Sequence, residues 1–132
     1  MRLSHENLRV YQTAIQFLAF SVDLLRRFPK GYADLSDQLR RAALSIPLNI
    51  AEGAGKPGRT DGARYFGIAR GSVLECGAVL DACAVLGIIG DSEMKQGKAL
   101  LISTAAMLTR LCGIRKGERP EVQVAGSGSG SR

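Results

Sequence analysis

The sequence predicts an all-α protein, folded as an antiparallel up-down four-helix bundle. Three observations predict it: apolar residues recur at helical spacing in four segments, glycine or proline separates these segments, and no segment alternates as a strand would. Short connections between helices favour antiparallel neighbours. Of the 132 residues, we assign residues 1–115 to the bundle and residues 116–132 to a flexible Gly/Ser-rich tail.

The first helix is predicted over residues 4–28, before Pro29. It carries two apolar stripes that start one residue apart and so lie about 100° apart around the helix. One stripe is Leu8, Tyr11, Ile15, Leu18, Val22 and Leu25, and the other is Val10, Ala14, Phe17, Leu24 and Phe28, interrupted by Ser21. Because an outer helix of a monomeric bundle needs one stripe, the pair favours burial on two sides and hence an oligomer. The alternative is that this helix is central in its own bundle.

The second helix is predicted to start near Asp34, with Asp37 as its capping-box partner, and to end around residues 53–55. Its apolar stripe is Leu35, Leu39, Ala42, Ala43, Ile46 and Ile50. Pro47 lies inside this pattern. Because proline removes one backbone hydrogen bond, we expect the helix to bend there.

Thr60 is the expected N-cap of the third helix, which reaches about Leu86 and buries the stripe Phe66, Ala69, Val73, Cys76, Leu80 and Cys83. Gly67 and Gly71 each cost about 1 kcal/mol relative to alanine, so we expect another backbone to come close to them. Asp91 is the expected cap of the fourth helix, which runs to about Ile114. Its expected core side includes Met94, Leu101, Leu108 and Leu111, with Leu100, Met107 and Ile114 alongside.

The charge favours an anionic partner. Lys and Arg number 18 against 12 acidic residues, 13 of the 18 are Arg, and residues 26–70 hold +5 of the net +6. Arginine forks match phosphate oxygens in pairs, so we expect a salt-sensitive, sequence-independent contact with nucleic acid. The candidate residues are Arg40, Arg41, Lys56, Arg59, Arg64 and Arg70. The alternative is a solvated surface with local salt bridges. Tyr65 is placed for base stacking or, the favoured interpretation, for interface packing.

Residues for catalysis are scarce, so we predict no enzyme, catalytic residue, metal or cofactor. His5 is the only histidine and lies near the N-terminus, which leaves no histidine-based triad or histidine-rich metal site. The run from Gly53 to Lys56 lacks the complete phosphate-loop pattern. Glu52 and Glu75 are isolated carboxylates, for which pairing with an arginine or capping of backbone is the favoured interpretation.

Cysteine usage and hydropathy indicate the compartment. The three cysteines, Cys76, Cys83 and Cys112, are an odd number and are not spaced as a CxxC motif, which favours a reducing compartment. We interpret Cys76 and Cys83 as small core residues. The chain contains no run of 18 apolar residues, so we expect no membrane span and a cytoplasmic location.

The second helix carries a distinctive motif, the run from Ser45 to Gly53 (SIPLNIAEG). This motif resembles the signature of a bacterial four-helix-bundle family that includes proteins encoded in intervening sequences of 23S ribosomal RNA genes. The same family contains the accessory variability determinant of diversity-generating retroelements. The resemblance covers residues 5–114 and extends to Leu8, Val10-Tyr11-Gln12, Phe28-Pro29, Gln38-Leu39-Arg40-Arg41-Ala42, Phe66, Ile68-Ala69, Gly71-Ser72 and Glu75.

The resemblance implies an assembly and partners. It implies a ring-like homo-oligomer, a pentamer, and for the retroelement members a basic surface that binds nucleic acid and associates with a reverse transcriptase. The signature positions in this chain are Ser45, Pro47, Asn49, Glu52, Gly53, Gly71, Ser72 and Glu75. We interpret them as structural. Ser45 and Asn49 offer polar groups near the carbonyl that Pro47 leaves without a partner. Because Glu52 lies at the unfavourable end of the helix dipole, we expect it to have a dedicated partner, either an arginine or a backbone donor on the third helix.

Three functions remain open at this point. The leading hypothesis is a non-enzymatic oligomeric scaffold that binds RNA or DNA and recruits a polymerase-type partner, as an accessory protein of a reverse transcriptase would. The second is a protein–protein assembly module encoded by a ribosomal RNA intervening sequence, with its basic residues consumed by inter-subunit pairs with Asp23, Asp81 or Glu75. The third is a fold kept by a mobile genetic element without an activity of its own.

Overall fold

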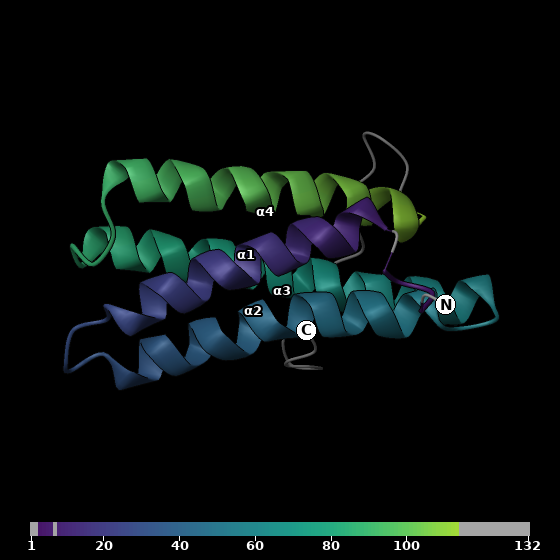
Figure 1. Cartoon of the computed structure of the whole chain (residues 1–132), viewed down its shortest axis with the longest axis horizontal. Helices are drawn as coiled ribbons and strands as arrows, with labels where there is room; N and C mark the ends of the chain where they lie inside the picture. The colour runs from purple at the N-terminus through teal and green to yellow at the C-terminus, as the bar shows by residue number, and fades with distance from the viewer. Residues whose placement is uncertain (1–2, 7, 114–132) are drawn as a thin grey trace, which may run out of the picture.

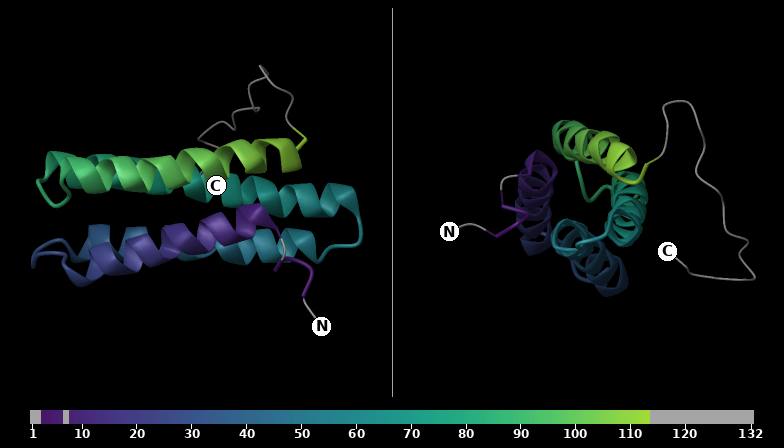
Figure 2. Two further views of the ribbon diagram at one scale, coloured as in Figure 1. Left: turned by 45° about the horizontal axis from the view of Figure 1, so that its top comes forward. Right: turned by 90° about the vertical axis from the view of Figure 1, so that its right-hand side faces the viewer.

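A computed structural model describes residues 3–6 and 8–113. This part of the chain contains four helices and no strand: α1 (Arg9–Arg26), α2 (Ala33–Ala54), α3 (Arg59–Val85) and α4 (Asp91–Leu111) (Figure 1). Each helix packs against the next, and α1 also packs against α4, so the four enclose one core (Figure 2). The predicted all-α four-helix bundle is confirmed, and the proposed tail, residues 116–132, lies outside the described residues.

Contacts between helices show the direction in which each helix runs. The hydroxyls of Ser45 on α2 and Ser72 on α3 lie 2.8 Å apart, and the Arg27 guanidinium, directly after α1, pairs with Glu93 near the start of α4. Further along, Lys98 of α4 reaches Asp81 of α3 at 2.7 Å. Successive helices therefore start at opposite ends of the bundle (Figure 1).

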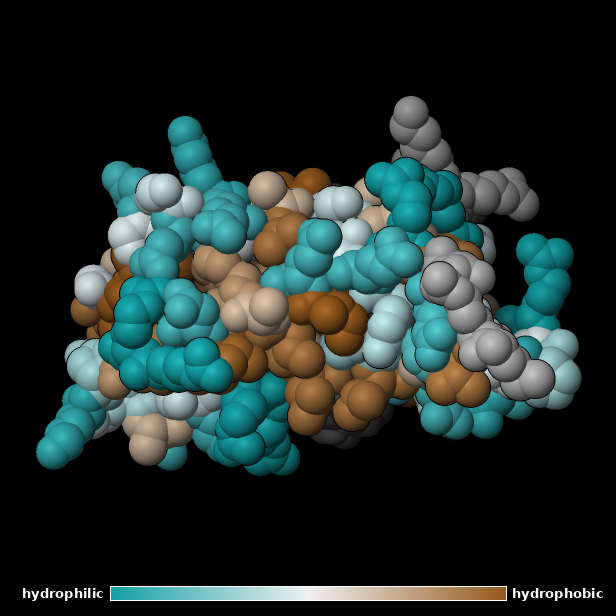
Figure 3. Space-filling view, in the orientation of Figure 1, coloured by the Kyte–Doolittle hydropathy of each residue, from teal (hydrophilic) through white to brown (hydrophobic). Residues whose placement is uncertain are grey.

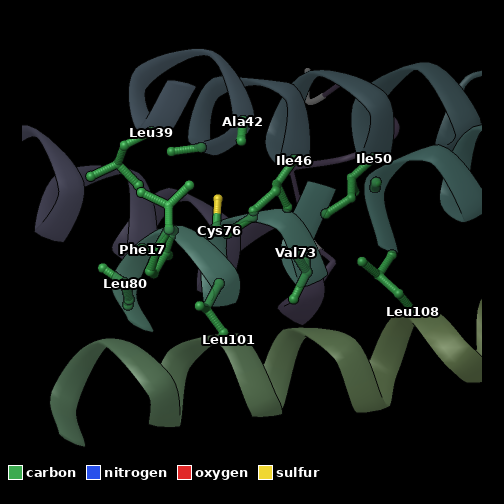
Figure 4. Packing of buried hydrophobic residues seen from close by; sticks show 14 of the residues in the cluster. Phe17, Leu39, Ala42, Ile46, Ile50, Val73, Cys76, Leu80, Leu101 and Leu108 are labelled. Atoms are coloured by element: carbon green, nitrogen blue, oxygen red, sulfur yellow. The ribbon is translucent and has the colours of Figure 1, made fainter. Parts of the chain in front are cut away.

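The core follows the predicted stripes on α2, α3 and α4 (Figure 4). All six predicted core positions of α3 are buried, as are the α2 positions from Leu39 to Ile50 and two of those on α4, Leu101 and Leu108. Cys76 and Cys83 are buried core residues, as predicted, and burial raises the pKa of the Cys76 thiol to about 12. Leu111 is 39% exposed because α4 ends there, so its assignment to the core was wrong, and Ile114 lies outside the described residues.

The two α1 stripes differ in how deeply they are buried. The buried residues are Val10, Ala14, Phe17, Ser21 and Leu24, the stripe that a serine interrupts. Ser21 is accommodated because its hydroxyl donates to the Phe17 carbonyl at 3.0 Å. In the other stripe, Ile15 and Val22 are 38% and 37% exposed, whereas its remaining residues are partly buried and pack against the edge of the core: Leu8, Tyr11, Leu18 and Leu25.

Helix ends differ from the predictions by a few residues. α1 begins at Arg9 because residues 4–6 form a turn, and Leu8 is its extended N-cap. Extended glycines, Gly58 and Gly90, precede α3 and α4, so Thr60 and Asp91 lie inside the helices and the predicted caps were wrong. The residue at the N-cap position of α2 is Tyr32, and Asp37 pairs with arginines instead of capping the helix.

The close approach of backbones occurs at other glycines than predicted. A Cβ added at Gly62 would lie 2.9 Å from the Gly53 carbonyl oxygen, and one added at Gly53 would lie 2.8 Å from the Phe66 ring. In contrast, an added Cβ at Gly71 has no described atom within 4 Å, and at Gly67 it meets the Cys112 sulfur at 4.0 Å. The glycine pair that brings α2 and α3 together is therefore Gly53 and Gly62.

The described residues contain neither a candidate membrane span nor a candidate metal site. None of the four helices is long and apolar enough to cross a membrane. Within residues 3–6 and 8–113, no three His, Cys, Asp or Glu side chains are grouped to hold a metal ion.

Candidate nucleic-acid interface

The net positive charge of the described residues lies toward one end of the bundle. We call it the basic end: it is where α1 and α3 begin and α2 and α4 end (Figure 1). Its cations come from α1, α3, α4 and the turn between α2 and α3, and the acidic residues there are Glu6, Glu52 and Asp61. The six cations are Arg9, Lys56, Arg59, Arg64, Arg70 and Arg110. In the other half, seven basic residues face seven acidic ones, so the described net charge of +3 belongs to the basic end.

Tyr65 lies between two cations of the basic end, Lys56 and Arg64. The Lys56 ammonium and the Arg64 guanidinium each lie 5.1 Å from the centroid of its ring, a cation–π distance. Both cations also have an acidic neighbour: Glu52 lies 3.2 Å from Lys56, and Asp61 lies 3.5 Å from Arg64. The hydrogen bond to Glu52, together with the charge of nearby groups, raises the pKa of Lys56. The Tyr65 ring is therefore engaged by cations of its own chain.

Arg59 and Arg70 are the other two α3 cations of the basic end, and they differ in exposure. Arg59 is the first residue of α3 and is exposed. Arg70 is half-buried, and its Nε donates to the Thr109 hydroxyl of α4 at 2.9 Å. Burial raises the pKa of the neighbouring Cys112 thiol, and the positive charge of Arg70 opposes this rise.

Arg40 and Arg41 lie away from the basic end. Both pair with Asp37 one turn earlier on α2, Arg41 at 3.3 Å, and their side chains are 64% and 77% exposed. The six candidates therefore do not form one surface. Lys56, Arg59 and Arg64 lie together at the basic end. Arg70 faces α4, whereas Arg41 lies on the other side of α3, where it lines a groove between α2 and α3.

Sequence reasoning missed two cations, Arg9 and Arg110. Each lies within one turn of a helix end, and the fold brings both ends to the same side of the bundle. They were missed because the charge was counted along the sequence between residues 26 and 70. The predicted bundle places the start of the first helix and the end of the fourth at the same end. Adding up the charge at each end of that bundle would therefore have identified Arg9 and Arg110.

The signature residues make contacts that were partly predicted. Asn49 donates to the Ser45 carbonyl at 2.9 Å and to the Ser45 hydroxyl at 3.0 Å, and Ser72 donates to the same hydroxyl. Asn49 therefore reaches Ser45 and not the carbonyl of Ala43, which Pro47 leaves without its usual donor. The partner of Glu52 is Lys56, in the turn after its own helix, so the prediction of a partner on α3 was wrong.

Comparison with known proteins places the chain in a family. The profile of the 23S rRNA-intervening sequence protein family matches residues 6–110. The chain belongs to this family. A solved structure with the same fold is a protein with unknown function of the S23 ribosomal protein family from Bacteroides thetaiotaomicron. It is 19% identical, the alignment covers 78% of this chain and 97% of that one, and the TM-score is 0.73. A search of curated protein sequences found no significant match.

On the outside of the bundle, a groove of about 360 Å³ lies between α2 and α3. All of its lining residues are among those that carry the family resemblance, and most are polar. They are Gln38, Arg41, Ala42, Ser45, Ile68, Ser72 and Glu75. Ser72 and Glu75, interpreted as structural from the sequence, therefore border a solvent-accessible groove.

Proposed function

We propose that this member of the family is a non-enzymatic scaffold that binds RNA or DNA through its basic end. The proposed subunit is an antiparallel up-down bundle with α2 bent at Pro47, assembled in the cytoplasm into a ring-like homo-oligomer, a pentamer. A further proposed role, recruitment of a reverse transcriptase, rests on the sequence resemblance alone.

The observation that carries the proposal is the uneven charge of the bundle. Six cations and three carboxylates lie in the half of the bundle that contains the basic end, on segments far apart in sequence, while seven cations and seven carboxylates balance in the other half. A concentrated positive surface attracts phosphate backbones at long range. Five of the six cations are arginines. Arg70 is half-buried, and the other four guanidinium groups are exposed, so they are available to pair with phosphate oxygens.

Local salt bridges do not remove this positive surface. The Glu52–Lys56 and Asp61–Arg64 pairs join residues three or four apart at one helix end, and Asp61, Arg64 and Glu52 are more than half exposed. Exposed pairs of this kind contribute about 0–1 kcal/mol. A phosphate group that makes charge-assisted hydrogen bonds with Lys56 or Arg64 therefore competes well with the carboxylates.

A salt series tests the proposal directly. Fluorescence anisotropy with a labelled single-stranded RNA and a labelled DNA duplex is expected to show binding that weakens linearly with the logarithm of salt concentration. Six neutralised phosphates correspond to a slope of about −4 for a single strand. Absence of binding at 50 mM salt, or affinity that does not change as salt rises, would contradict the proposal and leave the assembly module as the favoured function.

Apolar surface on α1 and α2 supports assembly. Ile15 and Val22 on α1 and Leu44 and Leu48 on α2 are exposed, the leucines to 44% and 59%, and Figure 3 shows hydrophobic surface in the middle of the face that α1 and α2 form. Grouped apolar surface of this kind is typical of protein interfaces.

Replacing Leu44 and Leu48 together with lysine is expected to convert the oligomer into monomers while circular dichroism retains the helical signal. Light scattering at micromolar concentration measures the mass. The matched control is Ile102→Lys on α4, which is 68% exposed and lies on another helix; it should leave the mass unchanged. A monomeric wild-type chain would contradict the proposed assembly.

A further inference from the structure

The groove between α2 and α3 presents groups that no step of the proposed function uses. Arg41 on the α2 wall and Glu75 on the α3 wall carry opposite charges, and Gln38 adds an amide beside Arg41. The Ser45 and Ser72 hydroxyls bond to each other at 2.8 Å, and Ile68 gives one apolar surface. The groove therefore offers a carboxylate acceptor, a guanidinium donor and an apolar wall within about 360 Å³.

The charged groups of the groove are accessible to a ligand. Arg41 contacts Asp37 at 3.3 Å but is 77% exposed, so redirecting its guanidinium costs little. Glu75 is exposed, and within residues 3–6 and 8–113 no cation lies within ion-pair distance of its carboxylate. A ligand that meets both groups must pair with a carboxylate on one edge and with a guanidinium on another.

We propose that this groove takes a guanine base from a single strand. Guanine presents two adjacent donors, N1–H and the N2 amino group, which match the two oxygens of the Glu75 carboxylate. Its O6 and N7 acceptors lie on the neighbouring edge and match Arg41, as arginine commonly pairs with guanine. Ile68 covers part of the base face. Uracil has a single N–H donor between two carbonyl oxygens, and the amino group of adenine or cytosine is next to a ring-nitrogen acceptor, so none of these bases offers two adjacent donors to a carboxylate.

The groove and the basic end lie along the same helix pair. Arg64 and Glu75 are eleven residues apart on α3, which corresponds to roughly 16 Å along the helix axis. A short single strand held by its phosphates at the basic end is therefore able to place an unstacked base in the groove, the common mode of RNA recognition. This inference rests on the proposed function and adds a base preference to it.

The test compares two RNA octamers of uridine, one with a central guanosine and one with inosine at the same place. Inosine lacks only the N2 amino group, so charge and backbone are identical. We expect the wild-type chain to bind the guanosine strand about fivefold more tightly, which corresponds to the low end of base discrimination because the groove is open to solvent.

Glu75→Gln is expected to abolish this fivefold ratio, because the amide no longer accepts both hydrogen bonds. Glu52→Gln is the matched control: it removes the same charge from an exposed carboxylate outside the groove, so it should retain the ratio. Salt-sensitive binding with equal affinity for both strands would overturn the guanine site and leave the proposed function intact. A change of oligomer mass on Glu75→Gln, with no wild-type preference for guanosine, would instead assign the groove to subunit contacts and also overturn the inference.

Discussion

Replacing Phe17 with alanine is expected to lower the free energy of unfolding by about 4 kcal/mol. The Phe17 ring is 0% exposed and lies among buried side chains of the core (Figure 4). Its removal costs the transfer free energy of the ring and leaves a cavity that the neighbouring helices fill only in part. Because domains of this size are stable by about 5–15 kcal/mol, the variant should be close to unfolded. Urea titration followed by circular dichroism measures the change.

Ile15→Ala is the control for Phe17→Ala, since it truncates the other stripe of the same helix. Ile15 is 38% exposed in the subunit, so its truncation should cost about 1 kcal/mol or less in dilute protein. Equal losses for the two variants would contradict the deeper burial of the stripe that contains Phe17.

Gly62→Ala and Gly71→Ala are expected to change stability in opposite directions. Both residues lie within α3, where alanine is favoured over glycine by about 1 kcal/mol. At Gly62 the added methyl group meets the Gly53 carbonyl oxygen at 2.9 Å, a backbone atom that moves only if α2 and α3 separate. Overpacking of this kind costs about 1–3 kcal/mol. At Gly71 the methyl group meets no described atom within 4 Å, so the helix-propensity gain remains.

Thermal or urea unfolding of both glycine variants should therefore give a less stable Gly62→Ala and a more stable Gly71→Ala, separated by about 2 kcal/mol. Oligomer mass is measured in parallel, because a neighbouring subunit against Gly71 would convert the gain into a loss of assembly. Equal stabilisation of both variants would contradict the tight contact between Gly53 and Gly62.

The fold was predictable to the extent that periodicity determines it. On α3 the stripe from Phe66 to Cys83 faces the core because its apolar residues recur at helical spacing on one side. On α1 periodicity left two stripes open, and the buried one contains Ser21, whose bond to the Phe17 carbonyl is invisible to hydropathy. The Gly53–Gly62 contact joins two helices, so spacing within one helix, as at Gly67 and Gly71, could not identify it.

The sequence predicted which kind of residue forms the candidate site, but it predicted the location of those residues only in part. The excess of arginine indicated an anionic partner from the sequence. However, Arg40 and Arg41 share Asp37 in the neutral half of the bundle, and Arg9 and Arg110 join the basic end only because the chain reverses direction at each turn. The α2–α3 groove likewise depends on side chains from two helices, which no single motif places together.

The most direct test of the central claim compares two triple variants of equal charge. One replaces Arg59, Arg64 and Arg110 of the basic end with glutamine, and the other replaces Arg26, Lys30 and Lys95 of the neutral half. In anisotropy titrations with single-stranded RNA, the basic-end variant should lose more than about tenfold in affinity at 50 mM salt, and its salt slope should become shallower by about 2. The neutral-half variant should lose less than about threefold by the same reasoning. Equal losses for the two variants would contradict binding at the basic end.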